Sequence, residues 1–288
     1  MLIPRRTFLA KAWAMTWVSA IGALLPSSPV KAQTSAQPKH LEDALLLLKE
    51  LRLENNNYQH GIPEVTWKGV NGAADYVSKT DCSGFMSKLL QHSYGDYFTD
   101  ERFKQQWIQE STRTRPLAED FHSAIVTKKD FLQLKKITQV KPGDIIAIKY
   151  IPDNNPKTKD NTGHVMLVVE TPKKRDSTKP MVKKTLQWEV RVIDQSCSGH
   201  GLNDSRRKPN ISDNGSQADG DGQTDNEQNN ACESNERFND GLGKGIIRIY
   251  SNEENGDILG YTWSISKKSP YYCPEERDLV IGRLDLKV

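Results

Sequence analysis

The stretch Thr80-Asp81-Cys82-Ser83-Gly84-Phe85 places a cysteine at the predicted start of a helix, and the predicted fold and site are arranged around this helix. Asp81 and Ser83 are residue types that cap the first turn of a helix, so a helix is expected to begin here. Cys82 then lies beside free backbone N–H groups and the positive end of the helix dipole, which stabilise a thiolate. Gly84 leaves one side of the turn bare, so a substrate backbone is expected to approach it. The pattern is compatible with a reactive thiol, and the alternative, which the motif alone favours, is a buried structural cysteine.

Helical patterns precede strand patterns along the chain. Apolar residues at helical spacing predict helices over residues 41–53, 81–91, 101–110 and 117–126, with a loop at 55–79. Short runs rich in Val and Ile predict strands over 144–151, 164–170, 186–194 and 279–284, and a hairpin of 246–250 with 259–265. Helices followed by strands are typical of an α+β fold with an antiparallel sheet.

Polar residues stand at the ends of these predicted strands. His164 opens an otherwise apolar strand, so its ring is expected at the sheet margin, within reach of the helix tip. There it accepts the thiol proton as general base while a third group holds its other nitrogen. If the strand that ends in Asp194 pairs with it, Asp194 or Gln195 orients the imidazole. The structural alternatives are a histidine bonded to a nearby carbonyl and an aspartate that caps a turn.

Three motifs together resemble the NlpC-type cell-wall peptidases, which are papain-like cysteine hydrolases. The motifs are Asp81-Cys82-Ser83-Gly84-Phe85, Pro142-Gly143-Asp144 and Gly163-His164-Val165, and the resemblance covers about residues 58–194. It implies a papain-like α+β domain whose nucleophile helix packs on an antiparallel sheet.

The resemblance also implies roles for single residues. Cys82 is the nucleophile, His164 the base and Asp194 the orienting residue. Tyr58 resembles the tyrosine that family members place near the oxyanion site. Further substrate or oxyanion candidates are Ser83, Gln195 and His200; the last is alternatively a substitute orienting group or a plain turn residue. No cofactor or metal is expected, because the histidines and cysteines show no paired spacing for zinc.

The substrate implied by the resemblance is a peptide bond in peptidoglycan stem peptides. The run Gly163-His164-Val165 with Val168-Val169-Glu170 also resembles the CHAP amidases, so an N-acetylmuramoyl-L-alanine amidase is an alternative. Two further alternatives are an acyl transferase or lipid-directed hydrolase on the same scaffold, and a cell-wall-binding protein with an inert thiol.

Residues 1–32 have the features of an export signal. Arg5-Arg6 followed by Phe8-Leu9 resembles a twin-arginine signal, and an apolar run leads to a cleavage site after Ala32. Export to the periplasm or cell exterior is therefore expected. An ordinary signal with two incidental arginines and an uncleaved anchor helix are the alternatives.

Removing this segment changes the charge of the chain. The chain has 40 Lys and Arg against 37 Asp and Glu, and the signal holds four of the basic residues, which leaves 36 against 37. This balance gives no case for nucleic-acid binding. A helical segment at 33–56 and a hydrolase domain at 57–288 are expected, as a monomer that is at most peripheral to a membrane.

The four cysteines all follow the signal. If Cys82 is a working thiol, one disulfide and one spare thiol are expected among Cys197, Cys232 and Cys273. Residues 203–240 are crowded with Asn, Asp, Gly and Ser, which predicts a disordered surface insertion.

Overall fold

The computed structural model describes residues 37–110, 112–151, 161–209 and 237–286, so the predicted signal at 1–32 lies outside the described residues. Within them, the α-helices are α1 (Lys39–Glu50), α2 (Cys82–Ser93), α3 (Asp100–Gln106) and α4 (Ala118–Val126). Short 3-10 turns occupy Leu53–Asn55, Val70–Gly72 and Ile137–Gln139. None of the helices in the described part is both long and apolar enough to cross a membrane.

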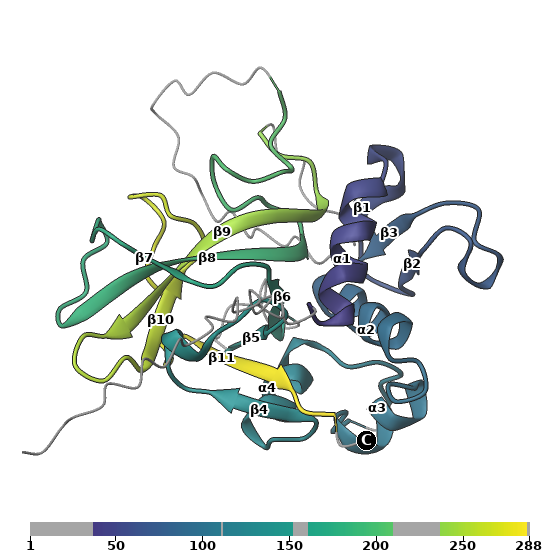
Figure 1. Cartoon of the computed structure of the whole chain (residues 1–288), viewed down its shortest axis with the longest axis horizontal. Coiled ribbons are helices and arrows are strands. Elements are labelled where there is room, and N and C mark those ends of the chain that lie inside the picture. Colours follow the sequence, from purple (N-terminus) through teal and green to yellow (C-terminus); the bar gives the residue numbers. More distant parts are fainter. Residues whose placement is uncertain (1–36, 111, 152–160, 210–236, 287–288) are drawn as a thin grey trace, which may run out of the picture. The chain divides into compact units, whose positions relative to one another are not determined.

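A curled antiparallel sheet forms the body of the molecule. Its strands are β4 (Phe131–Leu134), β5 (Ile145–Tyr150), β6 (Gly163–Val168), β7 (Lys173–Arg175), β8 (Thr185–Ser196), β9 (Gly241–Asn252), β10 (Ile258–Thr262) and β11 (Arg277–Leu284). They lie in the order β10-β9-β8-β6-β5-β11-β4, with β7 paired to β8. Figure 1 shows the long strands β8 and β9 running side by side, with the helices gathered toward one end of the sheet. The predicted α+β class with an antiparallel sheet is confirmed.

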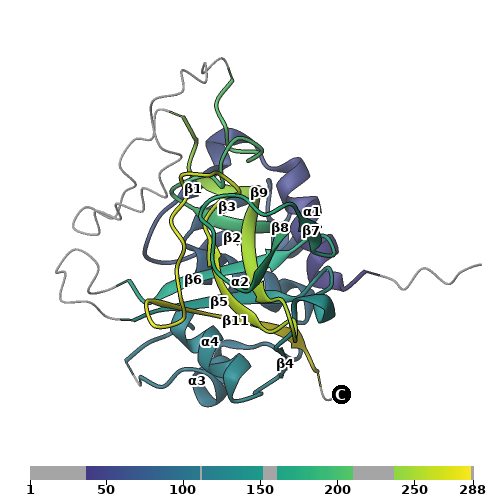
Figure 2. The ribbon, with the colours of Figure 1, turned by 90° about the vertical axis from the view of Figure 1, so that its left-hand side faces the viewer.

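The two faces of this sheet bury different cores. Along β5, Ile145 and Ala147 face the helices, whereas Ile146 and Ile148 face the opposite core, as the two-residue period of a strand requires. Burial on both faces explains why these strands read as continuous apolar runs. In Figure 2, α4 lies beside β5 and β11, and these elements are in contact.

A second, small sheet lies beside the start of α2, where the sequence predicts a loop at 55–79. It consists of β1 (Asn56–Tyr58), β3 (Val77–Thr80) and β2 (Glu64–Thr66), in the order β1-β3-β2. The prediction is wrong because these strands are short and mostly polar, so they carry no alternation of apolar residues. The small sheet bears on the candidate site, because β3 runs directly into α2 and fixes the position of the helix tip.

The predicted disordered insertion at 203–240 is wrong at its edges. Residues 201–209 and 237–240 are described, and Asp204 and Arg206 are buried within them. Their polarity reflects a buried ionic network and not solvent exposure. Residues 210–236 lie outside the described part. Two short strands, β4 and β7, were also absent from the predicted set.

Candidate functional site

Cys82 is the first residue of α2 and is 5% exposed. The residue before it, Asp81, caps the helix by accepting a hydrogen bond from Gly84 N at 2.7 Å. Asp81 also accepts from Ser83 Oγ at 3.0 Å and pairs with Arg115. The sulfur therefore lies at a rigidly capped helix N-terminus, as the sequence predicts, where the helix dipole favours negative charge.

The cap is itself an ionised group. Burial acts to raise the pKa of Asp81, but hydrogen bonds from His60 and the charge of Arg115 outweigh it and lower the pKa to about 2. Ser83, an oxyanion candidate, has its hydroxyl committed to this cap: it donates to Asp81 and accepts from Arg115 Nη1 at 2.8 Å. Its side chain therefore supports the helix tip, which leaves only its backbone N–H for an oxyanion.

The side of the turn that Gly84 leaves bare is occupied by the protein. A Cβ at this position would lie 2.1 Å from Thr80 Oγ1 and 2.9 Å from Pro63 Cγ. The expectation that a substrate backbone approaches Gly84 is therefore wrong. The glycine is needed so that α2 packs closely against the preceding strand and loop.

His164 lies on β6 and is 1% exposed. Its Nε2 atom lies 2.7 Å from Asp194 Oδ2, and Cys82 lies close enough to the ring to affect its pKa. Burial acts to lower the pKa of His164, but the negative charges of Cys82 and Asp194 outweigh it and raise the pKa to about 9. The ring is therefore protonated at neutral pH and lies between Cys82 and the carboxylate of Asp194.

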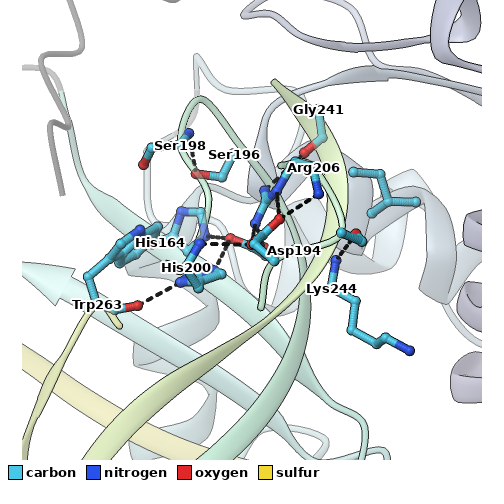
Figure 3. A network of polar contacts seen from close by, with 12 residues as sticks. His164, Asp194, Ser196, Ser198, His200, Arg206, Gly241, Lys244 and Trp263 are labelled. Carbon is cyan, nitrogen blue, oxygen red and sulfur yellow. Dashed lines mark hydrogen bonds and ion pairs between the residues drawn. The ribbon is translucent and has the colours of Figure 1, made fainter. Parts of the chain in front are cut away.

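Asp194 lies near the end of β8 and is fully buried. Its Oδ2 atom accepts from His164 and from His200 Nε2 at 3.0 Å, and its Oδ1 accepts from Arg206 Nη2 at 3.0 Å (Figure 3). Burial acts to raise the pKa of Asp194, but Arg206 and the two histidines hold it well below the usual range. The structure thus brings together Cys82, His164 and Asp194, the three residues to which the sequence assigns catalysis.

Sequence reasoning missed Asp204 and Arg206. Asp204 Oδ1 accepts from Arg206 N at 2.8 Å and Nε at 2.9 Å, and Oδ2 accepts from Nη2 at 2.7 Å. The signal that points to them lies on β9, where glycines alternate. A Cβ at Gly243 would lie 2.4 Å from Arg206 Nε, and one at Gly245 would lie 2.6 Å from Asp204 Oδ2. Alternating glycines on one strand face indicate that bulky groups from elsewhere fill that face.

The structure also places two other candidates, Tyr58 on β1 and Gln195 on β8. Tyr58 pairs with Thr80 across β1 and β3, and its ring stands edge-on to His60 at 5.3 Å. Gln195 Oε1 accepts from Ser78 Oγ at 2.8 Å, and Nε2 donates to Asn57 O at 2.7 Å. Gln195 therefore ties β8 to the small sheet, and Asp194 is the residue bonded to the His164 ring.

The described cysteines are of two kinds. Cys82 and Cys273 are free, whereas Cys197 is disulfide-bonded. The fourth, Cys232, lies outside the described residues. Among the residues that the structure describes, no group of three or more His, Cys, Asp and Glu side chains is arranged to hold a metal ion. The described site places a cysteine side chain, an imidazolium and a carboxylate in series.

The chain is 34% identical over 259 residues to a protein of Acanthamoeba polyphaga mimivirus, named uncharacterized protein R653. The match covers 88% of this chain and 99% of the viral protein. No protein-family profile matches the chain, and no solved structure matches it.

Proposed function

This chain belongs to the same family as the mimivirus protein R653, and from the geometry of its site we propose that it is a cysteine hydrolase that cleaves an amide bond. The observation that carries the proposal is the position of the His164 ring. One nitrogen is bonded to Asp194, and the ring lies beside Cys82, the first residue of a helix, closely enough for that residue to raise its pKa. This series is the arrangement that activates a thiol nucleophile.

In the proposed reaction, Cys82 Sγ attacks the amide carbonyl carbon and forms a C–S bond. Backbone N–H groups at the start of α2 stabilise the oxyanion. His164 gives its proton to the leaving nitrogen as the C–N bond breaks, which leaves a thioester. His164 then takes a proton from water, whose oxygen attacks the thioester; the C–S bond breaks, which releases the carboxylic acid and restores the Cys82 thiolate beside protonated His164. Asp194 keeps the ring oriented and stabilises its positive charge throughout.

We further propose that the domain is papain-like in the NlpC manner and acts on peptidoglycan stem peptides after export. The support for this substrate is the resemblance of three sequence motifs, together with the order cysteine, histidine, aspartate along the chain. The disulfide at Cys197 supports export, since such bonds persist in oxidising compartments. Replacing Arg5-Arg6 by two lysines is expected to block export of the chain from a bacterial host.

The test is digestion of purified peptidoglycan fragments by the chain from residue 33 onward, with product masses as the readout. Wild type is expected to cut within the stem peptide, and Cys82→Ala to lose at least about a hundredfold in rate. Cys273→Ala is the matched control and is expected to retain wild-type activity. Release of the intact stem peptide from the sugar would favour the amidase alternative. Full activity of Cys82→Ala would refute the mechanism.

A further inference from the structure

His200 is a second buried histidine on the carboxylate that holds His164. Its Nε2 atom lies 3.0 Å from Asp194 Oδ2, and its Nδ1 atom lies 2.8 Å from the carbonyl oxygen of Trp263. A backbone carbonyl only accepts hydrogen bonds, and the low pKa of Asp194 leaves its carboxylate an acceptor as well. Both ring nitrogens must therefore donate, and an imidazole that donates from both carries a positive charge.

The surroundings of His200 suit a fixed cation. Asp204 Oδ2 accepts from the backbone N–H of His200 at 2.8 Å, and the ring packs on Trp263 with the centroids 4.4 Å apart. An indole beside an imidazolium stabilises its charge. On β9, Gly245 leaves the space that the ring fills, since a Cβ there would lie 2.6 Å from His200 Cβ. The side chain of His200 is 0% exposed.

Asp194 lies among groups that attract its charge. His164 and Arg206 carry positive charge beside it, and His200 donates to the same carboxylate. Arg206 occupies Asp194 Oδ1 and is itself held by Asp204. The two histidines share the other oxygen, Oδ2, as Figure 3 shows. Removing the charge or the hydrogen bond of one of these groups changes how strongly Asp194 attracts the protons of the groups that remain.

We propose that His200 is a positioning residue that acts as a fixed buried cation and, by sharing Asp194 Oδ2, limits how tightly His164 holds its proton. This inference rests on the proposed function, because His164 must release that proton to the leaving nitrogen. Arg206 has the complementary role: it keeps Oδ1 occupied and so holds the carboxylate in the plane that serves both rings. His200 touches neither the sulfur nor the scissile bond.

The test removes the positive charge at position 200 and keeps one hydrogen-bond donor to Asp194. In His200→Gln the amide nitrogen still donates to Asp194 but carries no charge. The titration of the His164 ring is followed by long-range proton–nitrogen NMR, with its signals assigned through His164→Gln. Its midpoint is expected to rise by roughly one pH unit, as removal of a nearby like charge requires. His122→Gln is the matched control: it alters another buried histidine, bonded to Asp278 at 2.8 Å, and is expected to leave His164 unchanged.

An unchanged or lowered midpoint in folded His200→Gln protein would overturn the inference. If that variant does not fold, the ring nitrogens of His200 in the wild type give the answer. Each is expected to carry a hydrogen, as the two acceptors beside them require, and a ring with one bare nitrogen would overturn the inference. Neither measurement depends on turnover. The two proposals can fail separately. If Cys82→Ala still cleaves substrate, the proposed hydrolase mechanism is refuted. A raised His164 midpoint in His200→Gln would still support the electrostatic role of His200.

Discussion

His164 Nε2 lies 2.7 Å from Asp194 Oδ2, although 30 residues of chain separate them and neither side chain is more than 2% exposed. A buried ion pair is costly unless further hydrogen bonds complete it. Here Arg206 and His200 donate hydrogen bonds to the carboxylate, and Cys82 lies beside the imidazolium. The pair is thereby held in one orientation, with one ring nitrogen toward the sulfur.

The two free cysteines are expected to react very differently with iodoacetamide at pH 6. Cys82 lies beside the protonated ring of His164, which stabilises its thiolate. Cys273 is more exposed, but a hydrogen bond with Glu275 and burial raise its pKa. Cys82 is expected to be modified at least about ten times faster. Peptide mass mapping over time measures both rates in one sample, and faster labelling of Cys273 would contradict the pairing.

Hydrolysis is expected to persist to about pH 9 and to fall above it. Because the pKa of His164 is raised to about 9, the ring keeps the proton that the leaving nitrogen needs up to that pH and loses it beyond. Asp194→Asn removes a charge that raises this pKa, so the descending limb of kcat/KM is expected to move to lower pH. A limb that stays in place or moves upward in this variant would show that Asp194 does not act on His164. Melting temperatures of both proteins serve as the control.

The helix cap at Asp81 is expected to make stability fall in acid. The folded-state pKa of about 2 lies below the ordinary value of 3.8, so the contribution is complete above that value and disappears as the pH falls through 2. Asp81→Asn keeps a capping oxygen but loses the charge, and is expected to cost roughly 2 kcal/mol at pH 6. Urea unfolding at pH 6 and at pH 2.5 measures the difference between the two proteins. If the difference in unfolding free energy between the two proteins does not become smaller at pH 2.5, the stabilising role of the Asp81 charge is contradicted.

Gly163 sets the backbone from which His164 projects. Its φ is +136°, and a Cβ there would lie 1.8 Å from the carbonyl oxygen of Ile148 on the neighbouring strand. Gly163→Ala is expected to cost about 3 kcal/mol and to lower hydrolysis by displacing His164. Gly256→Ala is the matched control, because its φ is +78° with nothing within 4 Å of the added Cβ. The control is expected to cost about 1–2 kcal/mol and to leave activity intact. Equal losses in the two variants would show that the contact with Ile148 does not matter.

Much of the fold could be predicted from local pattern. The helix at Cys82–Ser93 and the strands β5, β6, β8 and β11 lie close to their predicted ranges, because each has a long apolar period or an apolar run. The small sheet at 56–80 could not be predicted in this way. Its strands are short and polar, and their pairing depends on the neighbouring elements and not on their own sequence.

The site divides in the same manner. The sequence by itself determined that a cysteine begins a helix, that a histidine begins an apolar strand and that an aspartate ends another, since capping and strand periodicity act over a few residues. Only the tertiary structure decided that Asp204 and Arg206 are buried and that His200 shares the carboxylate of Asp194. A charged residue in a polar segment reads as solvated, and it enters the interior only where distant groups neutralise it. Here the glycines of β9 leave space for the side chains of Asp204 and Arg206, and the carboxylates of Asp194 and Asp204 neutralise the charge of Arg206.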